Sequence, residues 1–252
     1  MSSAWLVSQP DEIAPLREQY RQEMNCQIIH DSIHGRPGWT REYALALDGA
    51  TVGYGSLAVD GPWHDRHALY EFYLQREHRM RTFDVFASLL AVCGAKIIET
   101  QSNDRMLTVM LHTFARNLRA ESILFEDVFQ TSYAPVGAEF RAATADDTEA
   151  LQRHDLDDGA GWVVTVNGEI AGAGDVLYHY NRPYGDVYMK IPEPFRRKGL
   201  GAYLVQELKA VCRAGGSVPA ARCNVQNLAS RKTLQRSGFV PCGNIVVGDL
   251  PE

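Results

Sequence analysis

The spacing of hydrophobic and polar residues predicts an ordered series of strands and helices. Ile13, Leu16 and Tyr20 recur at three- and four-residue steps, which is typical of an amphipathic helix. Two β-rich runs flank Asp48-Gly49, a pair that favours the tight turn of a hairpin. The first half is predicted to form a helix at 10–29, strands at 42–47, 52–59 and 69–74, a helix at 81–93, a strand at 96–100, a helix at 104–117 and a strand at 122–129.

The second half repeats this order. Its predicted elements are a strand at 139–143, a helix at 146–153, a hairpin of 162–166 and 169–178, a strand at 185–191 and a helix at 202–212. A shift of 119 positions (167 minus 48) places Asp48-Gly49 on Asn167-Gly168. The pattern breaks near Pro135, so we predict two copies of one fold, with domains at 1–133 and 134–252.

A basic turn with two glycines joins a predicted strand to a predicted helix. Gly199 and Gly201 let the backbone turn tightly and let a ligand approach its N–H groups. The helix that starts here points its free donors at the same place. Arg196, Arg197 and Lys198 add positive charge. The turn therefore predicts an anion site, for which a phosphate is the natural ligand.

Two common glycine-rich phosphate sites fit this turn less well. A dinucleotide-binding turn needs a third small residue where this chain has Leu204. A Walker-type loop needs its lysine after the glycine, whereas Lys198 precedes Gly199. The remaining pattern is Arg-x-x-Gly-x-Gly.

A second motif begins at Asn224 and ends with Gly238-Phe239. Asn227 can cap the helix between them, and Gly238 can end it in a left-handed conformation. In order and spacing the two motifs resemble the acetyl-CoA signature of the GNAT acyltransferases: Gln/Arg-x-x-Gly-x-Gly/Ala, then an asparagine, a helix and Gly-Phe. The resemblance covers residues 187–239.

This resemblance implies the fold and the co-substrate. The fold class is α/β, with two tandem GNAT-like domains, each a mixed, mostly antiparallel sheet flanked by helices. The co-substrate is acetyl-CoA, whose pantetheine arm binds strand backbone like an added strand. The residues that the resemblance assigns to it are Met189, Lys190, Ile191, Arg196, Arg197, Lys198, Gly199, Leu200, Gly201, Ala202, Asn227, Ser230 and Arg231.

The resemblance also implies a mechanism. In this family an amine attacks the thioester after a base has taken its proton, often through water. Asp186, at the start of the strand before the turn, is the candidate base. The alternative interpretation is that Asp186 is a turn residue on the surface at the end of a strand. Glu193 and Glu71 fit the role of the base less well. A tyrosine usually protonates the leaving thiolate, but Leu234 occupies its position. A thiol pKa of about 8.5 makes the thiolate a fair leaving group, so catalysis remains possible.

The first copy has lost the glycine pattern. Met80 and Thr82 align with Gly199 and Gly201, so two side chains stand where a pyrophosphate needs bare backbone. We expect the first copy to bind no acyl-CoA and to serve as a scaffold and acceptor-side wall, as in tandem members of the family with one working copy.

The composition of the chain limits the kinds of partner that the protein is expected to bind. The net charge of -6 lacks the basic excess that nucleic-acid binding requires. The five cysteines are scattered without a Cys-x-x-Cys pair, which fits a reducing, cytoplasmic location rather than disulfides or zinc. The longest apolar run, near 86–95, is too short to span a membrane. The pairs His30/His34 and His64/His67 leave a metal site as a weaker alternative.

We predict a cytoplasmic acyl-CoA-dependent N-acyltransferase that moves acetyl from acetyl-CoA to a primary amine of a small molecule or peptide by direct attack. The alternative is a non-catalytic acyl-CoA-binding sensor or scaffold, suggested by Leu234 and the degenerate first copy. No metal ion, nucleic acid or membrane is expected as a partner. The sequence predicts neither the acceptor nor the oligomeric state.

Overall fold

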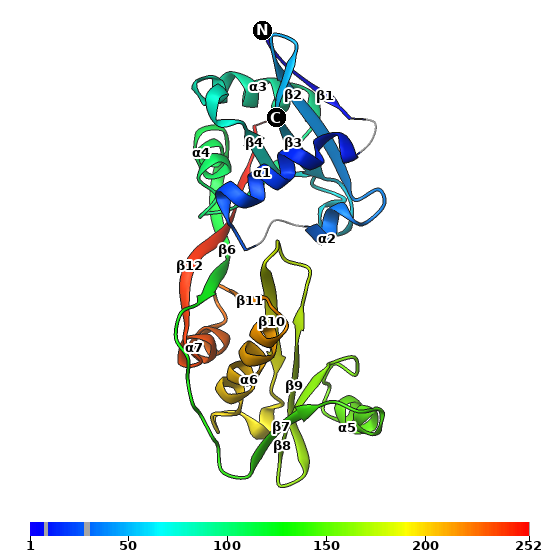
Figure 1. Ribbon diagram of the computed structural model, residues 1–252, viewed down its shortest axis with the longest axis vertical. Helices are drawn as coiled ribbons and strands as arrows, with labels where there is room; N and C mark the ends of the chain where they lie inside the picture. Colours follow the sequence, from blue (N-terminus) through cyan, green and yellow to red (C-terminus); the bar gives the residue numbers. More distant parts are fainter. Residues whose placement is uncertain (8–9, 28–30, 252) are drawn as a thin grey trace. The chain divides into compact units, whose positions relative to one another are not determined.

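The computed structural model describes residues 1–7, 10–27 and 31–251, which form two compact units (Figure 1). Unit 1 consists of Met1–Ser122 and Gly243–Glu252, and unit 2 of Ile123–Cys242. The sequence places a domain boundary between residues 133 and 134, whereas the contacts divide the chain earlier and group its last residues with unit 1. The reason is a long final strand, β12 (Phe239–Asp249), whose second part pairs with a strand of unit 1.

Unit 1 is built on a mixed, mostly antiparallel sheet. Its strands follow the order β1-β2-β3-β4-β5-β12, and only the β4–β5 pair is parallel. The strands before β12 are β1 (Ser2–Leu6), β2 (Thr40–Leu47), β3 (Ala50–Ala58), β4 (Ala68–Leu74) and β5 (Ile97–Gln101). Strand β1 is not predicted from the sequence, because its five residues show little of the alternating burial of a core strand.

The helices of unit 1 are α1 (Ala14–Met24), α2 (Asp31–His34), α3 (Thr82–Cys93) and α4 (Arg105–Phe114). Helix α1 is shorter than predicted because Asn25 adopts a left-handed conformation (φ 50°) that ends it; the last two residues of the predicted helix, 28 and 29, lie outside the described residues. Helix α4 is capped by Asp104, whose side chain accepts hydrogen bonds from the Met106 and Leu107 N–H groups. Phe72, Phe86 and Leu89 are fully buried where α3 packs on the sheet.

Strand β6 (Arg116–Asp127) begins earlier than predicted. The predicted helix at 104–117 stops at Phe114 because Ala115 is already extended (φ -98°, ψ 166°), and the chain continues directly into the strand. Strands β6 and β12 each contribute residues to both units.

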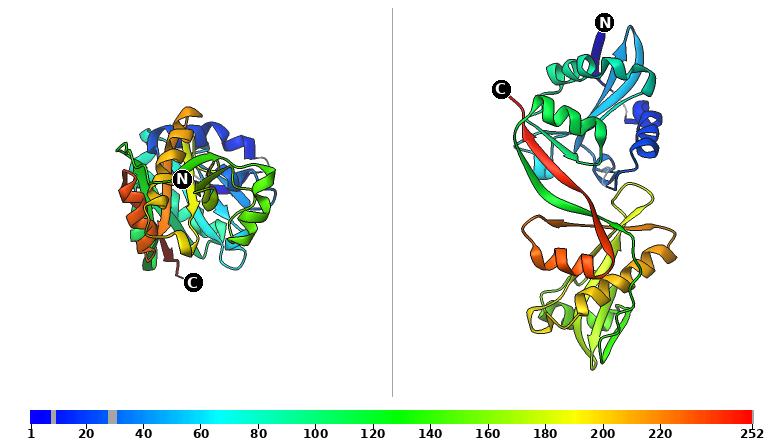
Figure 2. Two further views of the ribbon diagram at one scale, coloured as in Figure 1. Left: turned by 90° about the horizontal axis from the view of Figure 1, so that it is seen from below. Right: turned by 90° about the vertical axis from the view of Figure 1, so that its left-hand side faces the viewer.

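Unit 2 repeats the architecture. Its strands follow the order β6-β11-β10-β9-β8-β7, with a parallel β10–β11 pair, so the predicted mixed α/β class with flanking helices is confirmed. The strands are β7 (Ala138–Ala142), β8 (Trp162–Val166), β9 (Glu169–Leu177), β10 (Tyr184–Lys190) and β11 (Val218–Asn224), and the helices are α5 (Thr148–Arg153), α6 (Leu200–Ala214) and α7 (Leu228–Arg236). Helix α6 packs along β8, β9 and β10 with α7 beside it (Figure 2).

The amphipathic pattern of α6 explains this packing. Leu204, Val205 and Leu208 recur at helical spacing and are completely buried against the sheet. Gly174 lies beneath the helix, where an added Cβ would be 2.9 Å from the Leu208 side chain. The helix therefore lies close to the strands, and its first turn is held beside the end of β10.

Candidate functional site

A cleft opens in unit 2 where two parallel strands diverge. Tyr184–Asp186 of β10 pair with Val218–Ala220 of β11, and no further pairs join these two strands in the described chain. Beyond Asp186, β10 continues to pair with β9 on its other edge as far as Lys190. The β10 backbone groups that face the cleft are therefore available to a ligand. The cleft has a volume of about 230 Å³ and is lined by Asp186, Val187, Tyr188, Met189, Val205, Arg222, Ser230 and Leu234.

The cleft has an apolar face and a charged face. Successive strand residues point to opposite sides of a sheet. Val187 belongs to the core around α6, so Asp186 points to the other side. Ala220 is paired with Asp186, and Arg222, two residues further along β11, points to the same side as Ala220. Asp186 and Arg222 thus share the face opposite α6.

The basic turn precedes α6 and has an unusual backbone. Arg197 and Gly199 both adopt left-handed conformations, with φ of 63° and 81°. Alternation of this kind gathers N–H groups into a concave nest for an anion. A Cβ at Gly199 would meet nothing within 4 Å, so the space beside it is open. The predicted anion site therefore has a suitable backbone shape, and it lies at the N-terminus of a 15-residue helix.

The three cations of the turn have different surroundings. Arg196 donates from Nε to the Ile191 carbonyl at 3.0 Å, which fixes the turn to the end of β10. Lys198 lies over the Phe195 ring, 5.4 Å from its centroid. Arg197 is exposed. Two of the three predicted phosphate-binding side chains therefore also shape the turn.

Other residues assigned to acetyl-CoA support the turn from within. Leu200 and Ala202 are buried in the first turn of α6, and Ile191 is buried at the end of β10. An added Cβ at Gly201 would lie 3.1 Å from Thr233 Cγ2 and 3.4 Å from Met189 Cε. Gly201 thus allows α6 to pack closely against Met189 and Thr233. The sequence motif alone does not show whether this glycine is needed for packing or for the close approach of a phosphate.

The side chain of Lys190 points away from the cleft. Its ammonium group pairs with the Asp155 carboxylate at 2.6 Å. Tyr188, on the same side of the strand, donates to Asp157 at 2.7 Å. Only the backbone of Lys190 can therefore serve the cleft in this conformation.

The second motif forms α7 as the sequence predicts. The Asn227 side chain accepts from the Ser230 N–H at 3.0 Å and caps the helix. Ser230 and Leu234 line the cleft, and Leu234 is buried. Arg231 instead lines a separate hollow of about 420 Å³, together with Phe125 and Pro241. The structure thus brings Asp186, Met189 and Ser230 together at one cleft and places Arg231 outside its lining.

Sequence reasoning missed an imidazole beside the candidate base. Nε2 of His179, in the loop before β10, lies 3.0 Å from Oδ2 of Asp186. The Asp186 side chain is buried, whereas that of His179 is 34% exposed. A histidine seven residues before a strand aspartate is the signal that could have identified this pair from the sequence.

Tyr180 and Arg222 complete the charged face. Tyr180 is buried, and burial together with the nearby negative charge of Asp186 raises its pKa well above the usual value. The Arg222 guanidinium lies over the Tyr180 ring, 6.0 Å from its centroid. Neither residue is predicted from the sequence, because the contact joins a loop to a strand about 40 residues later (222 minus 180).

Unit 1 has a corresponding divergence that is closed. Ala68 and Leu69 of β4 pair with Ile97 and Ile98 of β5, and the strands then separate. The remaining cavity is only about 10 Å³, the space of a single water. The side chain of Tyr20 lines this cavity and donates to Asp104.

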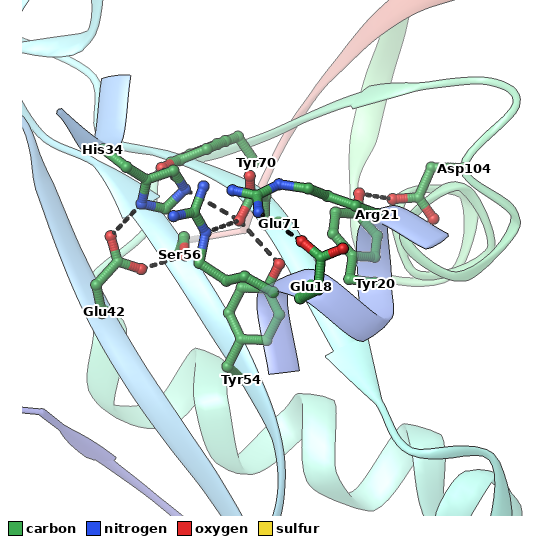
Figure 3. Close-up of polar contacts among 11 residues, drawn as sticks. Glu18, Tyr20, Arg21, His34, Glu42, Tyr54, Ser56, Tyr70, Glu71 and Asp104 are labelled. Atoms are coloured by element: carbon green, nitrogen blue, oxygen red, sulfur yellow. Dashed lines mark hydrogen bonds and ion pairs between the residues drawn. The ribbon is translucent and has the colours of Figure 1, made fainter. Parts of the chain in front are cut away.

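A buried ionic cluster lies on the same sheet (Figure 3). His34 of α2 bridges two carboxylates, with Nδ1 2.7 Å from Glu42 and Nε2 3.1 Å from Glu71. Tyr54 donates to Glu71 at 3.0 Å, and the Arg17 guanidinium lies 3.7 Å from the same carboxylate. We name these five residues the His34 cluster. Glu71 is thus held within unit 1 through Oε2, while its Oε1 has no hydrogen-bond partner among the described residues.

The cluster shifts the pKa of both central groups. Burial alone would lower the pKa of His34, but the charges of Glu71 and Glu42 and their hydrogen bonds outweigh it and raise the pKa to about 9. Burial would raise the pKa of Glu71, but His34 and Arg17 lower it to about 2. Neutral pH lies between these two pKa values, so His34 is protonated while Glu71 is ionised.

The weaker metal alternative has no matching geometry in the described residues. No group of three His, Cys, Asp or Glu side chains among them is arranged to hold an ion. His34 is occupied by its two carboxylates, His64 pairs with Asp65 at the surface, and His30 lies outside the described residues.

The turn after β4 lacks the nest of unit 2. Residues Arg76–Arg81 form a 3-10 helix that leads directly into α3. No residue described between Arg76 and Cys93 has a positive φ. Met80, aligned with Gly199, is almost fully exposed.

Comparisons with known proteins agree with this geometry. Residues 125–239 match the profile of the acetyltransferase (GNAT) family, and no curated protein matches the chain. A GNAT-family acetyltransferase from Colwellia psychrerythraea has a similar structure, with a TM-score of 0.77, 13% identity and coverage of 99% of this chain and 100% of that one.

Two further solved structures have the same fold. A tandem GNAT protein from the clavulanic acid biosynthesis pathway gives a TM-score of 0.62 at 12% identity, covering 98% of this chain and 97% of that one. A GCN5-related N-acetyltransferase from Sphaerobacter thermophilus gives 0.59 at 14%, covering 98% and 94%. At these identities the likeness concerns the fold.

None of the helices in the described part of the chain combines the length and apolarity that a membrane span needs.

Proposed function

Because residues 125–239 match the profile of the GNAT acetyltransferase family, we propose that unit 2 is an acyl-CoA-dependent N-acyltransferase that transfers acetyl from acetyl-CoA to a primary amine. The observation that carries the proposal is the open cleft between β10 and β11, together with the left-handed turn at Arg197 and Gly199 that precedes α6. A cytoplasmic location is part of the same proposal.

The chain offers separate contacts for each part of acetyl-CoA. The nest at Gly199 and the first N–H groups of α6 suit the pyrophosphate, with Arg197 and Lys198 adding charge. The cleft edge of β10, at Met189, Lys190 and Ile191, suits the amides of the pantetheine arm as an added strand. This arrangement brings the thioester to the cleft beside Asp186.

We assign proton removal to His179 with Asp186 behind it. Asp186 accepts from Nε2–H of His179, which leaves Nδ1 as the basic atom. The acceptor ammonium gives one proton to solvent and the second to Nδ1 as its nitrogen attacks the thioester carbonyl. The C–S bond then breaks, and CoA leaves as thiolate. Asp186 thus acts as the positioning residue for the base rather than as the base itself.

A specific observation favours the alternative of a non-catalytic acyl-CoA sensor. Leu234 lines the cleft where a family member usually carries its tyrosine acid, and it is buried in the core. Since CoA can leave as thiolate, the enzyme remains the better proposal. Release of CoA thiol with any amine in a broad acceptor panel supports the enzyme, and acetyl-CoA binding without release supports the sensor. A parallel panel of acyl-CoA donors tests the preference for acetyl.

A matched pair of glycine variants tests the site. Gly199→Val places a side chain in the open space of the nest, so acetyl-CoA affinity should fall roughly 100-fold as phosphate hydrogen bonds are lost. Gly168→Val is the control, because Gly168 also has a left-handed φ (86°) and open space but lies in the β8–β9 turn. Calorimetry that shows equal affinity in both folded variants contradicts the assignment.

A further inference from the structure

The charged face of the cleft contains a cation without a carboxylate partner. Arg222 is exposed and lines the cleft. Its guanidinium lies over the face of the Tyr180 ring, and it makes no ion pair or hydrogen bond within the residues that the structure describes. Guanidinium groups present a planar fork of donors that matches a carboxylate. Arg222 is therefore free to bind an anionic group that enters the cleft.

The opposite charge lies nearby on the same face. Asp186 is paired across the sheet with Ala220, and Arg222 is two residues further along β11, about 7 Å along the strand. The Asp186 carboxylate is held by His179, so it does not neutralise Arg222. The hydrogen-bonded pair of Asp186 and His179 therefore lies next to a separate cation, Arg222, on this face.

This arrangement is complementary to a ligand with an amine and a carboxylate. The amine lies at His179 and Asp186, where the proposed reaction needs it, and the carboxylate lies at Arg222. The apolar side of the cleft, formed by Val205 and Leu234, is left for the thioester. A neutral or purely cationic amine would leave Arg222 without a partner, and a second positive charge would be repelled by it.

Resting on the proposed function, we infer that Arg222 is a specificity-determining residue that binds a substrate carboxylate, and that the acceptor is an amino acid or a similar amine bearing a carboxylate. The same chemistry could come from a dicarboxylic acyl group on the CoA donor. We assign it to the acceptor because Arg222 shares the face of the proposed base rather than the apolar face next to α6.

The experiment measures CoA thiol release from acetyl-CoA with a panel of amino acids, each compared with its own primary amide. We expect the amino acids to have kcat/KM values roughly 10- to 100-fold higher, since a charge-assisted bond to Arg222 is present only with them. Arg222→Gln should remove this preference through KM, and Arg222→Lys should retain part of it. Arg153→Gln removes an exposed cation of unit 2 outside the cleft and should change nothing.

Two results overturn the inference while the proposed function stands. One is equal use of acids and amides, and the other is a preference that survives in Arg222→Gln. A further arm compares succinyl-CoA with acetyl-CoA using simple amines. Arg222 dependence confined to succinyl-CoA would place the carboxylate on the donor and overturn the acceptor assignment.

A binding measurement separates this inference from the enzymatic proposal. N-acetyl amino acids and their amides are titrated into the CoA-bound protein and followed by ligand-observed NMR, which needs no turnover. Carboxylate-dependent binding that disappears in Arg222→Gln supports the inference even if no acceptor reacts. Its absence overturns the inference, whatever the enzyme does.

Discussion

The parallel strand pairs of the two units diverge in the same way but lead to different clefts. In unit 2, β10 and β11 separate after three paired residues and leave about 230 Å³. In unit 1, β4 and β5 separate after two paired residues, and the cavity lined by Tyr20, Tyr70 and Asp104 has a volume of only about 10 Å³. A divergent strand pair therefore provides the framework of a site, and the side chains that fill it decide whether a ligand can enter.

The two units also differ in how their charged side chains are paired. In unit 1, His34 and Arg17 are matched by Glu42 and Glu71, so the His34 cluster is balanced and buried. In unit 2, Arg222 has no such carboxylate among the described residues, and His179 is partly exposed. Balanced buried charges hold a structure together, whereas unmatched charges at a cleft are available to substrates.

The largest expected effect concerns the imidazole of unit 2. His179→Gln keeps a polar side chain but removes the proton acceptor, so kcat should fall about 100-fold or more. Stability should change little, because the side chain is partly exposed. Rates from thiol release and melting temperatures are compared with those of His34→Gln, which should show the reverse pattern. A folded His179→Gln protein with normal kcat would show that another group takes the proton.

The next effect concerns the pH dependence of the His34 cluster. The pKa of His34 is about 9 in the folded protein and about 6.5 unfolded, so its stabilising contribution is complete below pH 6.5 and is lost as pH rises through 9. The full difference is about 3 kcal/mol. Urea unfolding between pH 6 and 10 measures it through tryptophan fluorescence, since Trp5, Trp39 and Trp63 lie in unit 1.

The control for this prediction is His34→Gln. This variant should be less stable at pH 6, because Glu42 and Glu71 lose their shared partner. It should also lack the part of the alkaline decline that His34 causes. An identical slope in both proteins would assign the decline to other groups.

A smaller effect is expected at Leu234. Leu234→Tyr places a phenol at the cleft, where it can protonate the departing thiolate, and we expect a rise in kcat of roughly threefold to tenfold. Leu234→Phe is the matched control, since it adds the same ring without the hydroxyl. Equal rates for the two variants would show that thiolate departure does not limit turnover.

The smallest effect tests the turns of the two units. Met80→Gly combined with Thr82→Gly restores the glycines of the motif in unit 1, yet the 3-10 helix and the closed cleft remain. We expect calorimetry to give one acetyl-CoA per chain in both the variant and the parent protein. Two equivalents of similar affinity in the parent would contradict the asymmetry between the units.

The parts of the site that were predictable depend on local backbone chemistry. Gly199 predicts a left-handed turn and Asn227 predicts a helix cap, because each effect depends only on residues within a few positions along the chain. The two signatures therefore predicted the left-handed turn, the helix cap and the family profile that residues 125–239 match. The role of Gly201 was less clear, because a glycine required for packing and one required for ligand approach look alike in a sequence.

The parts that were not predictable depend on distant pairings. His34 meets Glu71 across 37 positions (71 minus 34), and Arg222 meets Tyr180 through the fold alone. Hydrophobic periodicity does not predict such polar contacts. It also does not predict the partner of β12, because the pattern indicates a strand but not the strand with which it pairs.

The course of β12 also has a consequence for how the protein is made. Ile245–Asp249 pair with β5 residues that lie 144 or more positions earlier (245 minus 101), so they leave the ribosome after every other strand of unit 1. Until then β5 has an open edge, which is a template for wrong pairing. Pairing at such separation also forms slowly. We therefore expect newly synthesised unit 1 to expose the edge of β5 until the last strand of the chain has been made.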